Sequence, residues 1–283
     1  MIDIKANENC ARCLYNRQLR LTDNESYLSE IREIIAGRGE NDTAPYLVYR
    51  FNQVYERYFG ERPSYKDVKR QYNDLVLSIE DSLRQSIRSS SEPLEKAFLY
   101  ARIGNYIDFG AMNTVSESDF LAMLDSVGMS AQDREVMSSF CRQCAEASGF
   151  LLIADNCGEI VLDKLFLEQL KLEFPQLKLT VMVRGGEVLN DAAMEDALYV
   201  GIDKTAEVIS NGNPVSGTVY SMLSDEARSA LDGADVILAK GQGNYESMCE
   251  QGRHVFYSFL CKCELFTNKF NVPRLTGLFV EEE

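Results

Sequence analysis

Apolar residues in the first 145 positions recur at intervals of three and four, which is the spacing of one face of an α-helix. Pro45, Pro63 and Pro93 stand where three of these stretches begin, and proline is well tolerated in the first turn of a helix. Residues 116–120 lead into a fourth stretch. The pattern predicts an all-helical N-terminal part over residues 1–145.

The pattern changes near residue 149, where short runs rich in valine, isoleucine, leucine and phenylalanine begin. These runs are FLLIAD (150–155), LKLTVMV (177–183), VILAK (236–240) and HVFYSFL (254–260), with a shorter one near Val208 and Ile209. Helical stretches separate them at 159–174, 192–200 and 226–231. Strands that are apolar throughout and alternate with helices indicate a parallel sheet covered on both faces. The predicted fold class is therefore α/β, with a Rossmann-like, doubly wound and mainly parallel sheet in residues 146–283.

Composition and net charge limit the expected cellular location and binding partners of this chain. No run approaches the ~18 apolar residues of a membrane helix, and the start, MIDIKANENCARC, has no apolar signal segment. A cytoplasmic protein is expected. The net charge of -15 disfavours nucleic acid and anionic membranes as partners. An anionic substrate would need local positive charge from a metal or from a few cationic side chains.

Eight cysteines without an export signal favour reduced thiols over a disulfide framework. Six of them form two CxxC pairs and one CxC pair: Cys10 with Cys13, Cys141 with Cys144, and Cys261 with Cys263. A four-thiolate metal site is the less favoured interpretation, because the two CxxC pairs lie far apart in the chain. The single histidine, His254, is expected at a strand edge or in the core, and the acidic end 281–283 is expected to be solvated.

Polar segments follow four successive predicted strands. They begin at Asp155, Arg184, Ser210 and Gly241. Because the carboxyl ends of parallel strands meet at one edge of a sheet, these segments predict a binding site there. Taken singly, each has a simpler explanation: the acids and amides can cap the helices that follow, and the glycines can form ordinary turns.

The residue types in these segments favour a hard cation and an anion. Asp155, Asn156 and Asp191 offer oxygen ligands, which select Mg²⁺ or Mn²⁺ over zinc. Lys240 precedes a glycine-rich turn whose backbone N–H groups can approach an anion. Neither a P-loop nor a GxGxxG dinucleotide motif is present, since Glu246 stands where the third glycine would be.

Five segments, in this order and spacing, resemble the damage-control phosphatases of the acidic-residue-methyltransferase-1-like domain family. They are ARIGNYID (101–108), ADNCGE (154–159), RGGEVLNDA (184–192), SNGNPVSGT (210–218) and KGQGNYE (240–246). The N-terminal CxxC and the later Lys262-Cys263 pair are typical of the microbial branch of this family. The resemblance covers nearly the whole chain.

The resemblance implies a metal-dependent phosphatase acting on small phosphometabolites, such as sugar phosphates or damaged cofactor intermediates. It implies that Asp155, Asn156 and Asp191 bind a divalent metal, Mg²⁺ or Mn²⁺ with Co²⁺ or Ni²⁺ as alternatives. It further implies that Lys240, Gly241 and Asn244 contact the phosphate. The particular substrate does not follow from it.

The residues suggest how such a site would work. Lys240, Arg184 and Asn190 would hold phosphate charge, and Glu159 would orient water or act as general base. Asn105 and Asp108 would close the site from the helical part. Direct attack by Asp155 stays open, although the cysteine at position 157 replaces the second acid of an Asp-x-Asp pair and favours water.

Two other functions compete with the phosphatase. A nucleotide-cofactor methyltransferase would need a glycine-rich loop where Asp155 and Asn156 stand. A non-enzymatic module that binds a metal or a metabolite would leave Lys240 and Arg184 without a purpose. No oligomeric state is predicted.

Overall fold

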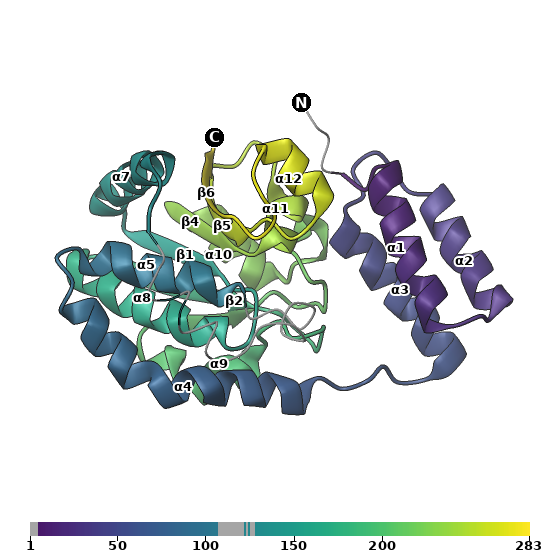
Figure 1. Cartoon of the computed structure of the whole chain (residues 1–283), viewed down its shortest axis with the longest axis horizontal. Coiled ribbons are helices and arrows are strands. Elements are labelled where there is room, and N and C mark those ends of the chain that lie inside the picture. The colour runs from purple at the N-terminus through teal and green to yellow at the C-terminus, as the bar shows by residue number, and fades with distance from the viewer. Residues whose placement is uncertain (1–4, 107–121, 123, 125–127) are drawn as a thin grey trace.

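The structure is a computed structural model that describes residues 5–106, 122, 124 and 128–283. Its first three helices are α1 (Glu8–Leu21), α2 (Glu25–Ala36) and α3 (Ala44–Phe59), and they form a small bundle to one side of the sheet (Figure 1). Side chains of Asn7 and Asn24 cap α1 and α2 by accepting hydrogen bonds from backbone N–H groups. The helix predicted from Pro45 is confirmed as α3.

The next helices pack on the sheet rather than on this bundle. They are α4 (Lys66–Arg88), α5 (Pro93–Gly104) and α7 (Ala131–Glu146). Val76 and Phe98 share one buried cluster with Phe150 of the sheet, whereas the core of α1–α3 forms a separate cluster. The hydrophobic core thus continues across the predicted boundary at residue 145. The helical stretch expected at 116–120 lies outside the described residues.

The six strands form one sheet in the order β3-β2-β1-β4-β5-β6. Their bounds are β1 (Gly149–Ile153), β2 (Lys178–Val183), β3 (Glu207–Ser210), β4 (Val236–Lys240), β5 (Val255–Leu260) and β6 (Gly277–Glu282). The first five pair in parallel, with Leu152 of β1 between Val181 and Leu238. The predicted α/β class and mainly parallel sheet are confirmed.

Strand β6 corrects one expectation, because the acidic end was predicted to be solvated. Glu281 and Glu282 belong to β6, which pairs antiparallel with β5. Glu281 accepts hydrogen bonds from Ser139 at 2.9 Å and from Gln143 at 2.8 Å, and it also contacts the ring of His254. Charged edge residues hid this strand from the hydrophobic pattern.

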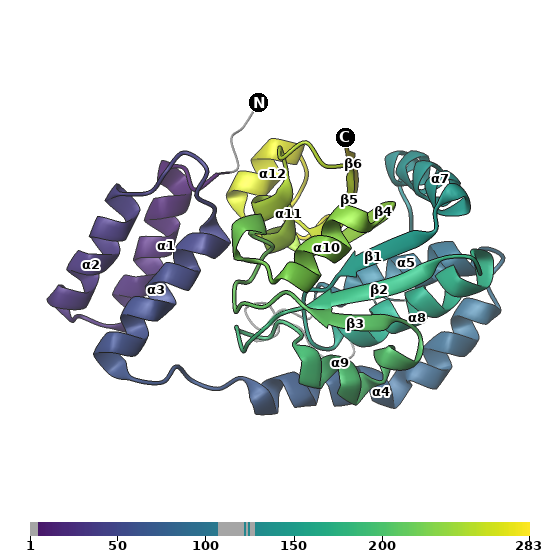
Figure 2. The same ribbon diagram turned by 180° about the vertical axis from the view of Figure 1, so that it is seen from behind.

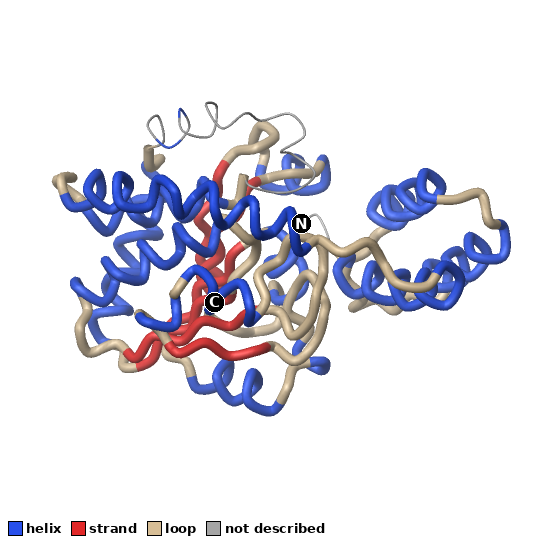
Figure 3. The backbone as a smooth tube through the Cα atoms, turned by 90° about the horizontal axis from the view of Figure 1, so that it is seen from below, coloured by secondary structure: helices blue, strands red, loops and turns tan. Residues whose placement is uncertain are grey.

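Helices cover both faces of the sheet (Figures 2 and 3). On one face α8 (Glu159–Glu173) packs with α4, α5 and α7, and α9 (Met194–Val200) joins them. On the other lie α10 (Asp225–Gly233), α11 (Gln242–Met248) and α12 (Glu264–Phe270). Burial on both faces explains why the strands are apolar throughout. No helix in the described part of the chain is long and apolar enough to span a bilayer.

The strand order reverses between β1 and β4, which lie side by side and lead to opposite halves of the sheet. In open α/β sheets a ligand binds outside the carboxyl ends of the strands at such a switch point. Asp155 follows β1 and Lys240 ends β4, so two predicted site residues stand at this point.

Candidate active site at the switch point of the sheet

Backbone pairing brings the segment after β1 against the loop after β2. The N–H of Ala192 donates to the carbonyl of Asp155 at 2.7 Å, and the N–H of Cys157 donates to the carbonyl of Asn190 at 2.8 Å. Asn156 and Asp191 form an isolated bridge between these two hydrogen bonds. The structure therefore places the three predicted metal ligands beside one another, and all three are buried.

Two amide groups hold two carboxylates together at the start of α8. The Nδ2 of Asn156 donates to Asp155 Oδ2 at 2.7 Å and to Glu159 Oε2 at 3.1 Å. The Nδ2 of Asn105, at the end of α5, donates to the same two oxygens at 2.8 and 3.0 Å. Asn105 thus reaches the site from the helical part, as predicted. Asp108 lies outside the described residues.

Gly158 allows the turn that brings Glu159 back toward Asp155. Its φ of 79° lies in the left-handed region, and its N–H donates to Asn73 Oδ1 of α4 at 2.7 Å. The sequence analysis missed Asn73. A polar residue on the buried face of an otherwise amphipathic helix was the available signal.

Lys240 lies in a different place from the one expected of a phosphate ligand. Its amine is fully buried and donates to Glu159 Oε1 and Asp163 Oδ1, both at 2.6 Å, and to the carbonyl of Ala101 at 3.0 Å. These three acceptors use all three protons of the ammonium group. The amine therefore fixes Glu159 instead of facing a ligand.

The charges around Lys240 keep its amine protonated. Burial lowers the pKa of Lys240, but the carboxylates of Asp163 and Glu159 outweigh burial and raise it above its ordinary value. Burial raises the pKa of Asp163 to about 7, although Lys240 opposes the rise. Asp163 was not predicted. It lies one helical turn after Glu159, in a stretch of α8 buried on all sides, where an acid is unusual.

Arg184, which follows β2, links the two halves of the site. Its Nε donates to Asp191 Oδ2 at 2.7 Å, and its Nη1 donates to the carbonyl of Gly217 and to Asn244 Oδ1, both at 3.1 Å. Its Nη2 is buried, lies 3.5 Å from Asp155 Oδ1, and has no hydrogen-bond acceptor among the described residues. Nη2 thus forms a long ion pair with Asp155 without completing a hydrogen bond.

Asn244 uses its side-chain amide to bind other protein groups, and Gly241 allows a close approach of the backbone to Asp155. Asn244 Oδ1 accepts from Arg184 and from Thr218 Oγ1 at 2.9 Å, and its Nδ2 donates to the carbonyl of Lys240 at 2.7 Å. Gly241 has a φ of 80°, and a Cβ atom there would lie 1.9 Å from Asp155 Oδ2. Glycine is therefore required for the close approach of this turn to Asp155.

Two further residues near the aspartates escaped the sequence analysis. Ser216 donates its hydroxyl to both carboxylate oxygens of Asp191 at 3.0 Å. Lys262, which follows β5, lies close enough to lower the pKa of Asp155. Both stand in segments quoted for the family resemblance, which was the signal for them.

Negative charge is in excess at this sheet edge. Four buried carboxylates, those of Asp155, Glu159, Asp163 and Asp191, share two buried cations, Lys240 and Arg184. Burial raises the pKa of Asp155 to about 8, and the carboxylates of Asp191 and Glu159 add to the rise. A bound cation would relieve this excess.

The donor set fits a hard divalent metal. The described residues contain no group of three or more histidine, cysteine or acidic side chains placed to hold a metal ion. The predicted set instead has two carboxylates and one amide, and Mg²⁺ commonly takes few protein oxygens and keeps several waters. Asn190 is buried beside this set.

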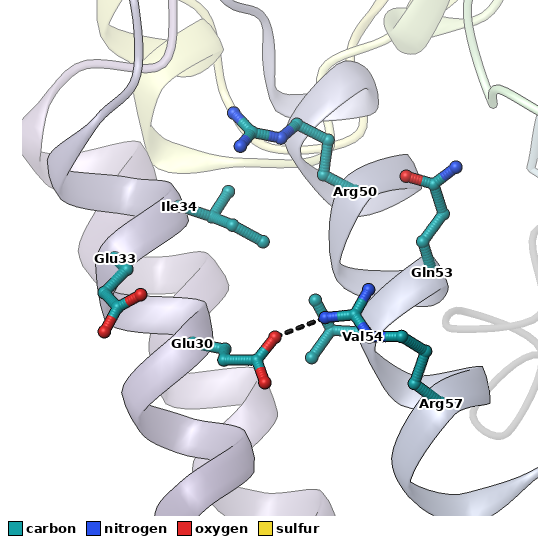
Figure 4. Close-up of a pocket in the computed structure, with 7 residues that line it drawn as sticks. All are labelled: Glu30, Glu33, Ile34, Arg50, Gln53, Val54 and Arg57. Carbon is teal, nitrogen blue, oxygen red and sulfur yellow. Dashed lines mark hydrogen bonds and ion pairs between the residues drawn. The ribbon is translucent and has the colours of Figure 1, made fainter.

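The cysteines form no disulfide, and a hollow in the helical bundle lies away from the site. All eight cysteines are free thiols, and Cys144 is buried in the core, as the apolar interpretation predicted. A hollow of about 300 Å³ lies between α2 and α3, where Arg57 pairs with Glu30 (Figure 4). None of its lining residues comes from the strand ends.

Fold and site define a Rossmann-like α/β protein with a buried polar site at the switch point of its sheet. The chain belongs to the damage-control phosphatase family: the family model described as "Damage-control phosphatase ARMT1-like domain" matches residues 6–276. This result confirms the resemblance seen in the sequence.

Individual relatives agree with this assignment. The chain is 28% identical to a damage-control phosphatase of Archaeoglobus fulgidus over 276 residues, which cover 92% of this chain and 93% of that protein. It is 25% identical to a damage-control phosphatase of Pyrococcus horikoshii over 284 residues, covering 96% of each. A crystal structure of a DUF89 family protein from Pyrococcus horikoshii superposes with a TM-score of 0.82 at 24% identity, covering 99% of this chain and 100% of that chain. That likeness confirms the fold.

Proposed function

We propose that this protein is a divalent-metal-dependent phosphatase that hydrolyses small phosphorylated metabolites, such as sugar phosphates or damaged cofactor intermediates. Membership of the damage-control phosphatase family and the names of the relatives support the phosphatase role. The metal and the substrate class are part of the proposal.

The observation that carries the proposal is Nη2 of Arg184, which has a 3.5 Å ion pair with Asp155 but no hydrogen-bond acceptor among the described residues. A buried guanidinium nitrogen without an acceptor is costly unless a ligand completes it. It faces Asp155 at 3.5 Å, beside the hard oxygen ligands. A phosphoryl oxygen accepts such a hydrogen bond well, because its negative charge strengthens the bond.

Asp155, Asn156 and Asp191 would hold the divalent metal, Mg²⁺ or Mn²⁺ with Co²⁺ or Ni²⁺ as alternatives. The metal would supply positive charge against the phosphate oxygens. Asp155 suits a ligand better than a nucleophile, because Oδ2 accepts from two amides and Oδ1 faces Arg184.

The remaining residues divide into two roles. Lys240, Asn105 and Asn156 hold Glu159, which would accept a proton from an attacking water. Lys240 is thereby a positioning residue. Arg184 and Lys262 would supply positive charge toward the phosphate, and Asn244 fixes Arg184.

The competing functions fit the site less well. A methyltransferase would need an open glycine-rich loop after β1, whereas Asp155 and Asn156 are buried there and Asn156 donates to Glu159. A passive binding module would not need a buried carboxylate held by hydrogen bonds from three residues beside an arginine nitrogen that lacks a hydrogen-bond acceptor among the described residues.

The test is hydrolysis of p-nitrophenyl phosphate after chelation and re-addition of Mg²⁺, Mn²⁺, Co²⁺ or Ni²⁺. Asp155→Asn and Asp191→Asn should each lower kcat by at least ~100-fold. Glu173→Gln, which changes an exposed carboxylate at the end of α8, should leave it unchanged. Wild-type turnover in either aspartate variant would refute the assigned ligands, and full activity after chelation would refute metal dependence. A panel of phosphometabolites then defines the substrate.

A further inference from the structure

The loop that carries Arg184 and Asp191 makes a second set of contacts, directed away from the sheet. Its middle residue, Glu187, accepts hydrogen bonds at Oε1 from the hydroxyl of Ser64 at 2.9 Å and from the backbone N–H of Tyr65. Arg62 Nη2 donates to the carbonyl of Glu187 at 3.4 Å. Residues of the linker between α3 and α4 therefore bind this loop.

These contacts connect two parts of the chain with separate hydrophobic cores. Arg62 also pairs with Glu56 of α3 at 2.8 Å, so one arginine joins the helical bundle to the carbonyl of Glu187. Tyr65 is the N-cap residue of α4 and supplies no side-chain cap of its own. The Glu187 carboxylate accepts from the backbone N–H of this N-cap residue, and negative charge is favourable at the N-terminus of a helix.

The loop needs such an anchor because its backbone is strained. Leu189 has a φ of 47°, in the left-handed region that costs a residue with a side chain roughly 1–2 kcal/mol. Strained residues persist only where surrounding contacts hold them. Leu189 lies two residues after Glu187 and two before Asp191, so a loop released at Glu187 can relax at Leu189 and displace Asp191.

We propose that Glu187 is a positioning residue: by binding Ser64 and Tyr65 of the linker, it holds the strained loop that places Arg184 and Asp191 in the candidate site. The kinetic part of this inference rests on the proposed phosphatase function. The structural part, a tie between linker and loop, stands without it.

The experiment compares Glu187→Ala with Glu187→Gln and uses Glu61→Ala as a matched control. Glutamine keeps the Oε1 acceptor that both donors share, whereas alanine removes it. Glu61 is an exposed acid of the same linker, so its replacement changes net charge equally. Two measurements are made: amide hydrogen exchange of residues 60–66 and 184–191, and kcat and KM with p-nitrophenyl phosphate well below the melting temperature.

Alanine should speed exchange in both segments by about tenfold or more and lower kcat/KM by roughly 5- to 50-fold. Glutamine should restore both measurements to within about twofold, and Glu61→Ala should change neither. Unchanged exchange in Glu187→Ala would refute the tie. Faster exchange with kinetics equal to those of Glu61→Ala would refute the positioning role. If the wild type hydrolyses no phosphoester, the proposed function fails, and exchange of 184–191 alone decides whether Glu187 holds the loop.

Discussion

Replacing Lys240 by methionine tests whether its buried ion network holds the site. The amine lies 2.6 Å from one oxygen of Glu159 and 2.6 Å from one oxygen of Asp163, and none of the three side chains is exposed. Methionine fills similar space but leaves two carboxylates buried without their shared cation. Removing one partner of a buried ion pair typically costs about 3–5 kcal/mol, because the remaining charge stays desolvated. We expect Lys240→Met to lower stability by at least that amount.

Thermal unfolding followed by far-ultraviolet circular dichroism measures this loss. In a chain of this size 1 kcal/mol corresponds to roughly 2 °C, so Tm should fall by about 6–10 °C. Lys178→Met is the matched control, since Lys178 pairs with Glu207 at 2.8 Å on the surface, with exposed fractions of 74% and 51% for the two side chains. Its Tm should change by less than ~2 °C.

A further variant separates charge from packing. Adding Glu159→Gln and Asp163→Asn to Lys240→Met removes the stranded charges and should recover part of the lost Tm. A Lys240→Met protein that melts as the Lys178→Met protein does would refute the buried network. Failure of the triple variant to recover would show that packing, not charge, causes the loss.

Two other changes test the same region. Burial raises the pKa of Asp163 to about 7, so this group stabilises the fold fully only below its unfolded pKa of about 4 and loses that contribution as pH rises toward 7. Asp163→Asn keeps an acceptor for Lys240, and in urea titrations it should flatten the fall of unfolding free energy between pH 4 and pH 7. An unchanged slope would contradict this account. Gly241→Ala would place a Cβ atom 1.9 Å from Asp155 Oδ2, so soluble expression or Tm should fall far more than for Gly252→Ala, where φ is also positive but no atom lies within 4 Å of the added Cβ. The Gly252→Ala change should lower stability by only about 1–2 kcal/mol. Equal Tm values for the two variants would show that Asp155 moves to make room for the added methyl group.

The sequence predicted the parts of the site that local pattern determines. Apolar runs located β1 and β4, and polar residues directly after them, Asp155 and Gly241, fall at the switch point. Parallel pairing of β1 with β2 brings the segments after them together, and Asp191 then pairs with Asn156 in an isolated antiparallel bridge. These outcomes follow from strand direction and burial alone, which a sequence carries in its hydrophobic pattern.

Which side chains of the site bind one another could not be predicted in the same way. Lys240 was expected at the phosphate because it precedes a glycine turn, yet its side chain points back between Glu159 and Asp163 of α8. The direction in which a lysine side chain points at the end of a strand depends on how α8 packs against the sheet. Strand β6 was missed for a related reason: only Phe279 in it is buried, and pairing with β5 supplies the rest.

The location of charge explains why the two buried cations, Arg184 and Lys240, both matter and why their roles differ. In the proposed site, a cation that contacts the ligand keeps a donor without a hydrogen-bond acceptor, and Arg184 has such a donor at Nη2 among the described residues. A cation that orients a base must instead spend every donor on the protein, as the amine of Lys240 does. Because the four carboxylates outnumber these two cations, the proposed divalent metal would supply the missing positive charge and allow an anionic phosphate to bind beside it. The metal would neutralise Asp155 and Asp191, and the phosphate would complete Arg184, so each ligand removes the cost of the other.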